Sequence, residues 1–134
     1  MQEKNSMMRP LLMTLALLAA SPAAAQDWRM APEYDVLLTT WDIAPGQLRL
    51  KSGEPVRLRF VNNSNRDLKF SAEDFFKNAR LRQRDGGTVA KGAIMVPSLS
   101  TRTVVLVPKA GRYKMRGGNV AQRVAGMNGT IIVE

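Results

Sequence analysis

The chain has 134 residues, 45% hydrophobic and 23% charged, and contains neither cysteine nor histidine. Without those residue types it cannot form a disulfide, a thiolate zinc site, a Ser-His-Asp triad or an imidazole-ligated metal centre. Its 20 Lys and Arg exceed its 11 Asp and Glu, so the protein is basic, with a formal net charge of +9. The length fits one domain, and the composition favours a globular, non-catalytic protein over an enzyme or a disordered chain.

The first 25 residues have the pattern of a secretory signal peptide. Lys4 and Arg9 precede an apolar run at 11–20, and Ala23 and Ala25 occupy the small-residue positions of a cleavage site. The run is too short to cross about 30 Å of hydrocarbon, which disfavours a membrane anchor. We therefore expect a signal peptide at 1–25, a mature domain at 26–134, and a periplasmic location.

The mature chain alternates between apolar and polar side chains in short segments that end at turn residues. The segments lie at 47–51, 56–60, 101–107, 112–116 and 130–133. This spacing predicts a β-sandwich or barrel, and half-buried alternation favours antiparallel pairing. We expect five side chains to be buried between the sheets: Leu58, Phe60, Val105, Tyr113 and Ile131.

One segment departs from the alternation and predicts a short helix. Residues 71–81 begin with Ser71 as an N-cap candidate and carry acids in the first turn and bases in the last. Phe75 and Phe76 would pack on the edge of a sheet. Residues 82–92 are polar and contain glycine, so we expect a loop there.

Four phrases of the sequence resemble the cupredoxins, the blue-copper family of plastocyanin and pseudoazurin. WDIAPGQLRLKSGEPVRLRFVNNS is similar to the family's opening strands, and LKFSAEDFF to the segment with the first copper ligand. MVPSLSTRTVVLVPKAGRYKM is similar to the strand pair before the ligand loop, and AGMNGTIIVE to the family's ending. The resemblance implies an all-β, cupredoxin-like Greek-key β-sandwich with one short helix.

The resemblance also implies four copper-ligand positions. Cupredoxins bind copper through two His, one Cys thiolate and a weak axial Met, and they transfer single electrons. The first His position falls on Leu68, or on Lys69 if the alignment shifts by one residue. The family's Cys-x4-His-x4-Met spacing, counted back from Met127, reaches Gln122 and Gly117. Only Met127 keeps its ligand type, so we expect no cofactor, and copper is implied by the resemblance alone.

Thioethers suit Cu(I), so the methionines of the mature chain offer an alternative metal site. They are Met30, Met95, Met115 and Met127. Packing explains them more simply, and we expect Met95 and Met115 to lie in the core.

The excess positive charge lies in the second half of the chain. Residues 26–65 carry no net charge, whereas residues 66–134 carry 13 bases and five acids. Five of the bases are candidates for partner binding: Arg80, Arg82, Arg84, Arg116 and Arg123. A solvated surface is one explanation, and a docking face for an acidic periplasmic protein or an anionic membrane surface is the other. Nucleic acid is disfavoured because of export and because exposed aromatics do not alternate with the bases.

These observations favour an exported, non-catalytic cupredoxin-like binding module that has lost the type 1 copper site. By analogy it would be an accessory protein of a periplasmic metal-uptake or respiratory system. One alternative is a copper ion carrier that uses Met127 and non-standard ligands. Another is a blue-copper electron-transfer protein, which the missing ligands disfavour.

Overall fold

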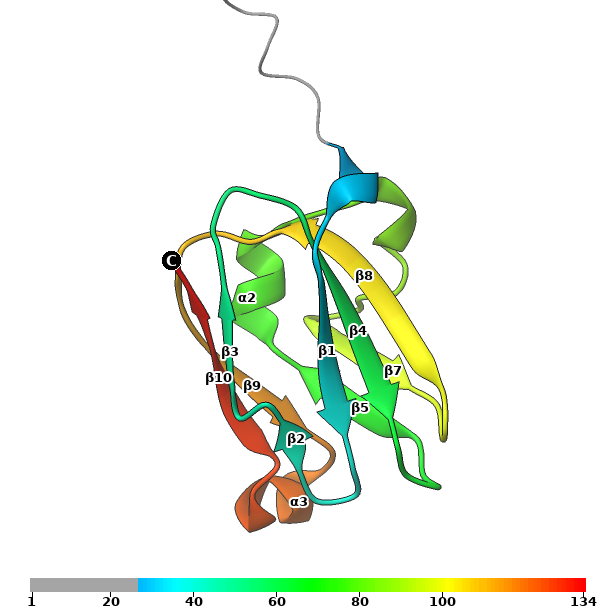
Figure 1. Ribbon diagram of the computed structural model, residues 1–134. Coiled ribbons are helices and arrows are strands. Elements are labelled where there is room, and N and C mark those ends of the chain that lie inside the picture. Colours follow the sequence, from blue (N-terminus) through cyan, green and yellow to red (C-terminus); the bar gives the residue numbers. More distant parts are fainter. Residues whose placement is uncertain (1–26) are drawn as a thin grey trace, which may run out of the picture.

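The computed structural model describes residues 27–134, which form two facing β-sheets (Figure 1). One sheet has the order β2-β1-β4-β8-β6 and the other β3-β10-β9-β5-β7. The first contains β1 (Glu33–Leu38), β2 (Ile43–Ala44), β4 (Val56–Asn62), β6 (Arg80–Leu81) and β8 (Thr101–Val107). The second contains β3 (Gln47–Leu50), β5 (Leu68–Ser71), β7 (Ala93–Val96), β9 (Gly111–Gly117) and β10 (Asn128–Val133). The signal peptide expected at 1–25 lies outside the described residues.

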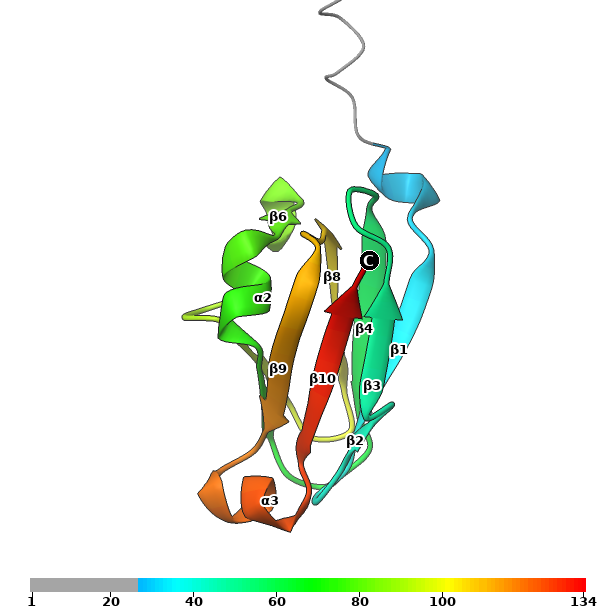
Figure 2. The same cartoon turned by 90° about the vertical axis from the view of Figure 1, so that its left-hand side faces the viewer.

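Two short α-helices and two 3-10 turns complete the described part of the chain. They are α2 (Glu73–Asn78), α3 (Val120–Ala125), η3 (Trp28–Met30) and η4 (Gln83–Asp85). Figure 2 shows α3 at one end of the sandwich and β6 at the other, with α2 beside β9. None of the helices in residues 27–134 has the length and hydropathy that crossing a bilayer requires.

Both sheets are mixed, whereas the alternation favoured antiparallel pairing throughout. Strand β1 runs parallel to β4, with Val36 opposite Phe60, and β10 runs parallel to β3, with Ile131 opposite Leu48. The antiparallel prediction is wrong for these two pairs. Alternation reports which face of a strand is buried, and that face is the same whichever way the neighbouring strand runs.

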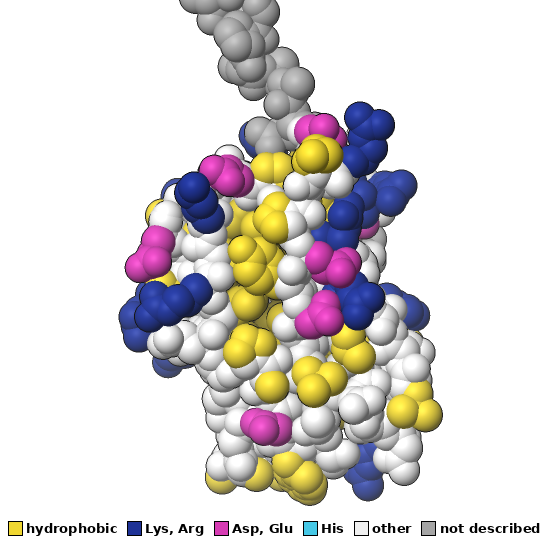
Figure 3. Space-filling model, in the orientation of Figure 1, with side chains coloured by type: hydrophobic (Ala, Val, Ile, Leu, Met, Phe, Trp, Pro, Cys, Tyr) yellow, Lys and Arg dark blue, Asp and Glu magenta, His cyan; other side chains and the backbone are white. Residues whose placement is uncertain are grey.

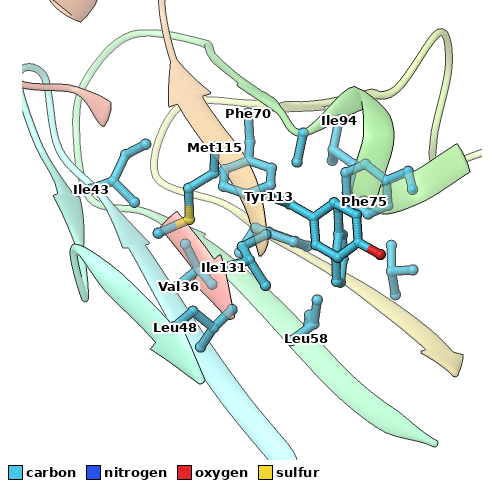
Figure 4. Packing of buried hydrophobic residues seen from close by; sticks show 14 of the residues in the cluster. Val36, Ile43, Leu48, Leu58, Phe70, Phe75, Ile94, Tyr113, Met115 and Ile131 are labelled. Atoms are coloured by element: carbon cyan, nitrogen blue, oxygen red, sulfur yellow. The ribbon is translucent and has the colours of Figure 1, made fainter. Parts of the chain in front are cut away.

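Apolar side chains from both sheets meet in one core (Figure 4). The predicted burial of Leu58, Phe60, Tyr113 and Ile131 is confirmed, since none is more than 8% exposed. The rings of Phe60 on β4 and Phe70 on β5 join the two sheets, with centroids 4.6 Å apart.

Val105 is buried as expected, but on the other face of its strand. Its neighbours Val104 and Leu106 belong to the core between the sheets, so Val105 faces outward from β8. The backbone N–H of Val105 donates to Asp85 Oδ2 at 2.9 Å, and its carbonyl accepts from Arg82 N at 2.8 Å. The turn around η4 therefore covers Val105.

The helix predicted within 71–81 is present as α2, but its start differs from the prediction. Ser71 ends β5, and the N-cap is Ala72, which has no side-chain capping bond. Burial of Phe75 and Phe76 holds the helix instead, with Phe75 packed edge-on against Tyr113 at 5.6 Å between centroids. Helix α3 is an addition to the single helix expected from the sequence.

Candidate functional site

The positions that resemble copper ligands lie at the end of the sandwich that α3 occupies (Figures 1 and 2). They are Leu68 at the start of β5, Gly117 at the end of β9, Gln122 in α3 and Met127 just before β10. Gly117 N donates to the Met127 carbonyl at 2.9 Å, and Gly118 N donates to the Lys69 carbonyl at 2.8 Å. These backbone bonds hold the three strand ends together.

The side chain of Met127 occupies the space beside Gly117. A Cβ atom added at Gly117 would lie 2.5 Å from Met127 Cε and 2.9 Å from its Sδ, closer than real Cβ contacts. Met127 is fully buried. Where the resemblance places a cysteine thiolate, the protein therefore has the Met127 thioether, and a further side chain there would require Met127 to move.

The amide of Gln122 is engaged in the structure of the α3 loop. Gln122 N donates to Asn119 Oδ1 and Asn119 N donates to Gln122 Oε1, both at 3.0 Å, which forms a capping box. Gln122 Nε2 donates to the Thr40 carbonyl. A Cβ at Gly118 would overlap with Gln122 Oε1, so the loop needs glycine there. Both polar atoms of the side chain have protein partners.

The first ligand position is also apolar and packed. Leu68 is 2% exposed and belongs to the core, whereas Lys69, the alternative position, is exposed on the outer face of β5. The loop before Leu68 is anchored by buried Asn62, whose Nδ2 donates to the Arg66 carbonyl at 2.7 Å and the Val96 carbonyl at 2.9 Å. The four positions together do not fit a type 1 copper ion.

The thioethers do not replace the missing ligands. Met30 and Met95 are exposed, whereas Met115 and Met127 are fully buried. The expected burial of Met95 is wrong, because the register of β7 turns Ile94 and Val96 inward and Met95 outward. Residues 27–134 also contain no group of three or more His, Cys, Asp or Glu side chains that could hold a metal ion.

The five arginines proposed for partner binding do not form one surface. Arg116 is exposed near the end of β9 and Arg123 is half-buried in α3, whereas Arg80 and Arg84 lie at or just after β6, at the opposite end of the sandwich (Figure 2). Arg82 pairs with buried Asp85 at 2.9 Å and serves the fold. These arginines form two groups along the chain, at 80–84 and at 116–123. The fold places the two groups at opposite ends of the sandwich.

Two exposed apolar side chains at the α3 end were missed by the sequence reasoning. Trp41 is 54% exposed and Val124 is 84% exposed. The segment that carries Trp41 contacts the α3 loop through the Thr40 carbonyl. In Figure 3 hydrophobic and uncharged side chains predominate at the lower end, over β2 and α3. In the sequence, Trp41 lies outside the alternating segments that predict strands. This position was the one feature of the sequence that could have indicated its exposure to solvent.

Neither a protein-family model nor a curated protein matches the sequence. Solved structures do match the fold. Auracyanin from Roseiflexus castenholzii is 14% identical with a TM-score of 0.56, over 78% of this chain and 98% of that chain. Copper nitrite reductase from Nitrosomonas europaea is 14% identical with a TM-score of 0.57, over 86% of this chain and 52% of that chain. A multi-copper oxidase from Pseudomonas thermotolerans is 17% identical with a TM-score of 0.56, over 78% of this chain and 29% of that chain.

The chain thus spans nearly all of auracyanin but about half or less of the two enzymes. Its two β-sheets enclose a core at whose α3 end the segments of the ligand-like positions meet. The protein therefore has the cupredoxin fold and lacks the histidine and cysteine ligands of the blue-copper site.

Proposed function

We propose that this protein is a non-catalytic cupredoxin-like binding module that has lost the type 1 copper site. The absence of cysteine and histidine at the ligand-like positions carries the proposal, and the Met127 side chain lies in the space beside Gly117 where a thiolate ligand would begin. The use of Gln122 as a capping and loop-anchoring residue supports it. The fold supports a role in binding, since the cupredoxin framework remains without the ligands.

The proposed binding surface is the α3 end, and the proposed partner is an acidic protein. Trp41 and Val124 offer exposed apolar contact area there, and Arg116 and Arg123 add positive charge. Apolar centres with charged surroundings are typical of transient protein interfaces. The signal-peptide pattern at 1–25 supports export to the periplasm. By analogy with cupredoxin-like domains that lack the copper ligands, the proposed role is that of an accessory protein of a periplasmic metal-uptake or respiratory system.

Copper titration tests the proposal. We expect Cu(II) to give no intense thiolate-to-copper absorption in the visible spectrum and no tight site in isothermal titration, with a blue-copper protein measured in parallel. A tight Cu(II) site in the titration would overturn the proposal, whereas the absence of the thiolate band already follows from the absence of cysteine.

A Cu(I) titration separates the module from the copper-carrier alternative. We expect no tight Cu(I) site, because Met127 is buried and packed on Gly117. Tight binding that disappears in Met127→Leu, a change that conserves volume, would favour the carrier instead.

A further inference from the structure

The outer face of the second sheet carries a pocket of about 360 Å³. Its floor comes from neighbouring strands, because Lys69 on β5 pairs with Met95 on β7, and Ser71 on β5 pairs with Arg116 on β9. These side chains alternate with buried core residues along their strands. The pocket is therefore separate from the core and does not include Leu68, Gly117, Gln122 or Met127, although Lys69, the alternative first-ligand position, lies on its floor.

Three further segments wall the pocket. Helix α3 contributes Arg123, the first turn of α2 contributes Glu73, and the turn before β7 contributes Lys91. Helix α3 is attached to the rest of the fold through the bond from Gln122 to the Thr40 carbonyl, and the turn before β7 packs on the start of α2.

The turn that carries Lys91 is fixed in an unusual conformation. Lys91 and Gly92 both have positive φ, at 54° and 74°, between Ala90 and Ala93, which exchange two backbone hydrogen bonds. This is the geometry of a tight primed turn, and the left-handed region is uncommon for lysine. A Cβ at Gly92 would lie 2.6 Å from Glu73 Cα, so the turn packs directly on the start of α2. Lys91 is thus held at the rim.

The pocket has an excess of positive charge that the described protein does not neutralise. Four cationic side chains and one carboxylate line it. Within residues 27–134 the ion pairs involve other side chains, and none of these four cations has a side-chain hydrogen bond. Arg123 Nε is buried and has no hydrogen-bond partner in that part of the chain. A buried donor without an acceptor is costly, so the Arg123 guanidinium is held in place without a compensating protein partner in that part of the chain.

We propose that this pocket binds a small organic anion with two or more carboxylate or phosphate groups. The guanidinium groups of Arg116 and Arg123 offer paired donors that match such groups, and Lys69 and Lys91 add point charges. Met95, exposed on the floor, provides apolar contact for the carbon frame of the ligand. Glu73 can accept a hydrogen bond from a hydroxyl or amino group of the ligand. The volume suits a small molecule, and the site goes beyond the proposed loss of copper.

Isothermal titration at constant ionic strength tests the site with three probes: citrate, 2-phosphoglycerate and neutral glycerol. The anionic groups of citrate are all carboxylates, whereas those of 2-phosphoglycerate are one carboxylate and one phosphate, so the pair distinguishes the two anion types. We expect saturable one-site binding of at least one of them at millimolar concentration or below, and none of glycerol. Absence of saturable binding for both anions would overturn the proposal.

Matched variants locate the binding. Arg123→Gln and Lys69→Gln should each weaken binding by about tenfold or more, since each removes a charged partner. Arg112→Gln and Lys114→Gln remove the same charge from β9 outside this pocket, and should change affinity by about twofold or less. Equal weakening by both sets would show diffuse attraction to a basic surface and overturn the proposal. Lys69 is exposed, so its variant answers the question even if Arg123→Gln fails to fold. The copper titration is unaffected by either result, so the two proposals fail separately.

Discussion

Two consecutive glycines decide how the α3 loop packs. At Gly117 a Cβ would meet the Met127 side chain, and at Gly118 it would meet the Gln122 amide. Gly118 also has a φ of +65°, which side chains other than hydrogen rarely adopt. The side chains of Met127 and Gln122 are both buried. In the observed packing, Met127 fits because Gly117 has no side chain, and Gln122 fits because Gly118 has none.

Gly117→Ala should lower the free energy of unfolding by about 1–3 kcal/mol, because overpacking forces Met127 out of its position. Urea unfolding measures the change. Gly87→Ala is the control, since a Cβ there meets nothing within 4 Å, and it should stay within about 0.5 kcal/mol of the parent. If the two variants were equally stable, Met127 would not fill the space at Gly117, and the argument against copper would rest on the absence of cysteine and histidine alone.

At the scale of the elements, α3 depends on its cap. A helix of six residues is marginal by itself, and the reciprocal bonds between Asn119 and Gln122 satisfy donors at its start. Asn119→Ala should therefore cost about 1 kcal/mol of stability and increase amide exchange at Arg123. Exposed Asn63→Ala serves as the control. Unchanged exchange in the helix would show that the contact of Gln122 with Thr40 holds α3 without the cap.

Strands β1 and β5 were not among the predicted segments, whereas β3, β4, β8, β9 and β10 could be predicted because burial of one face imposes a period of two on the sequence. The direction of β1 and β10 could not, since parallel and antiparallel neighbours bury the same face. Helix α3 has too few turns to show a period of its own, although the capping-box spacing of Asn119 and Gln122 was visible. The ligand-like positions came from the resemblance. The filling of the space at Gly117 by Met127 depends on three-dimensional packing that no spacing reveals.

At the scale of the whole molecule, the aromatic contact between the two sheets contributes to the free energy of unfolding. Phe60 and Phe70 come from different sheets and lie in ring contact, so Phe60→Ala opens a cavity shared by both. We expect a loss of about 3–5 kcal/mol, and a smaller loss of about 1–1.5 kcal/mol for Phe60→Leu. Denaturant unfolding followed by circular dichroism measures both. A loss for alanine no larger than that for leucine would show that the contact does not join the sheets.

The distribution of charge over the whole molecule yields the last prediction. Arg116 and Arg123 lie at the α3 end, and Arg80 and Arg84 at the other, so two double reversals to Glu change the net charge equally at opposite ends. If an acidic protein docks at the α3 end, reversing Arg116 and Arg123 should slow association much more than reversing Arg80 and Arg84. The difference between the two association rates should shrink as salt rises, because exposed charges are screened beyond about 8 Å at physiological ionic strength.

The measurement is the association rate with an acidic partner captured from periplasmic extract. No polyanions are added, since the same arginines line the anion pocket. Folding stability should stay within about 0.5 kcal/mol for the reversal of exposed Arg80 and Arg84, and it is measured for the other pair because Arg123 is half-buried. If both reversals slow association equally at every salt concentration, the partner responds only to net charge, and the α3 end is not the docking surface.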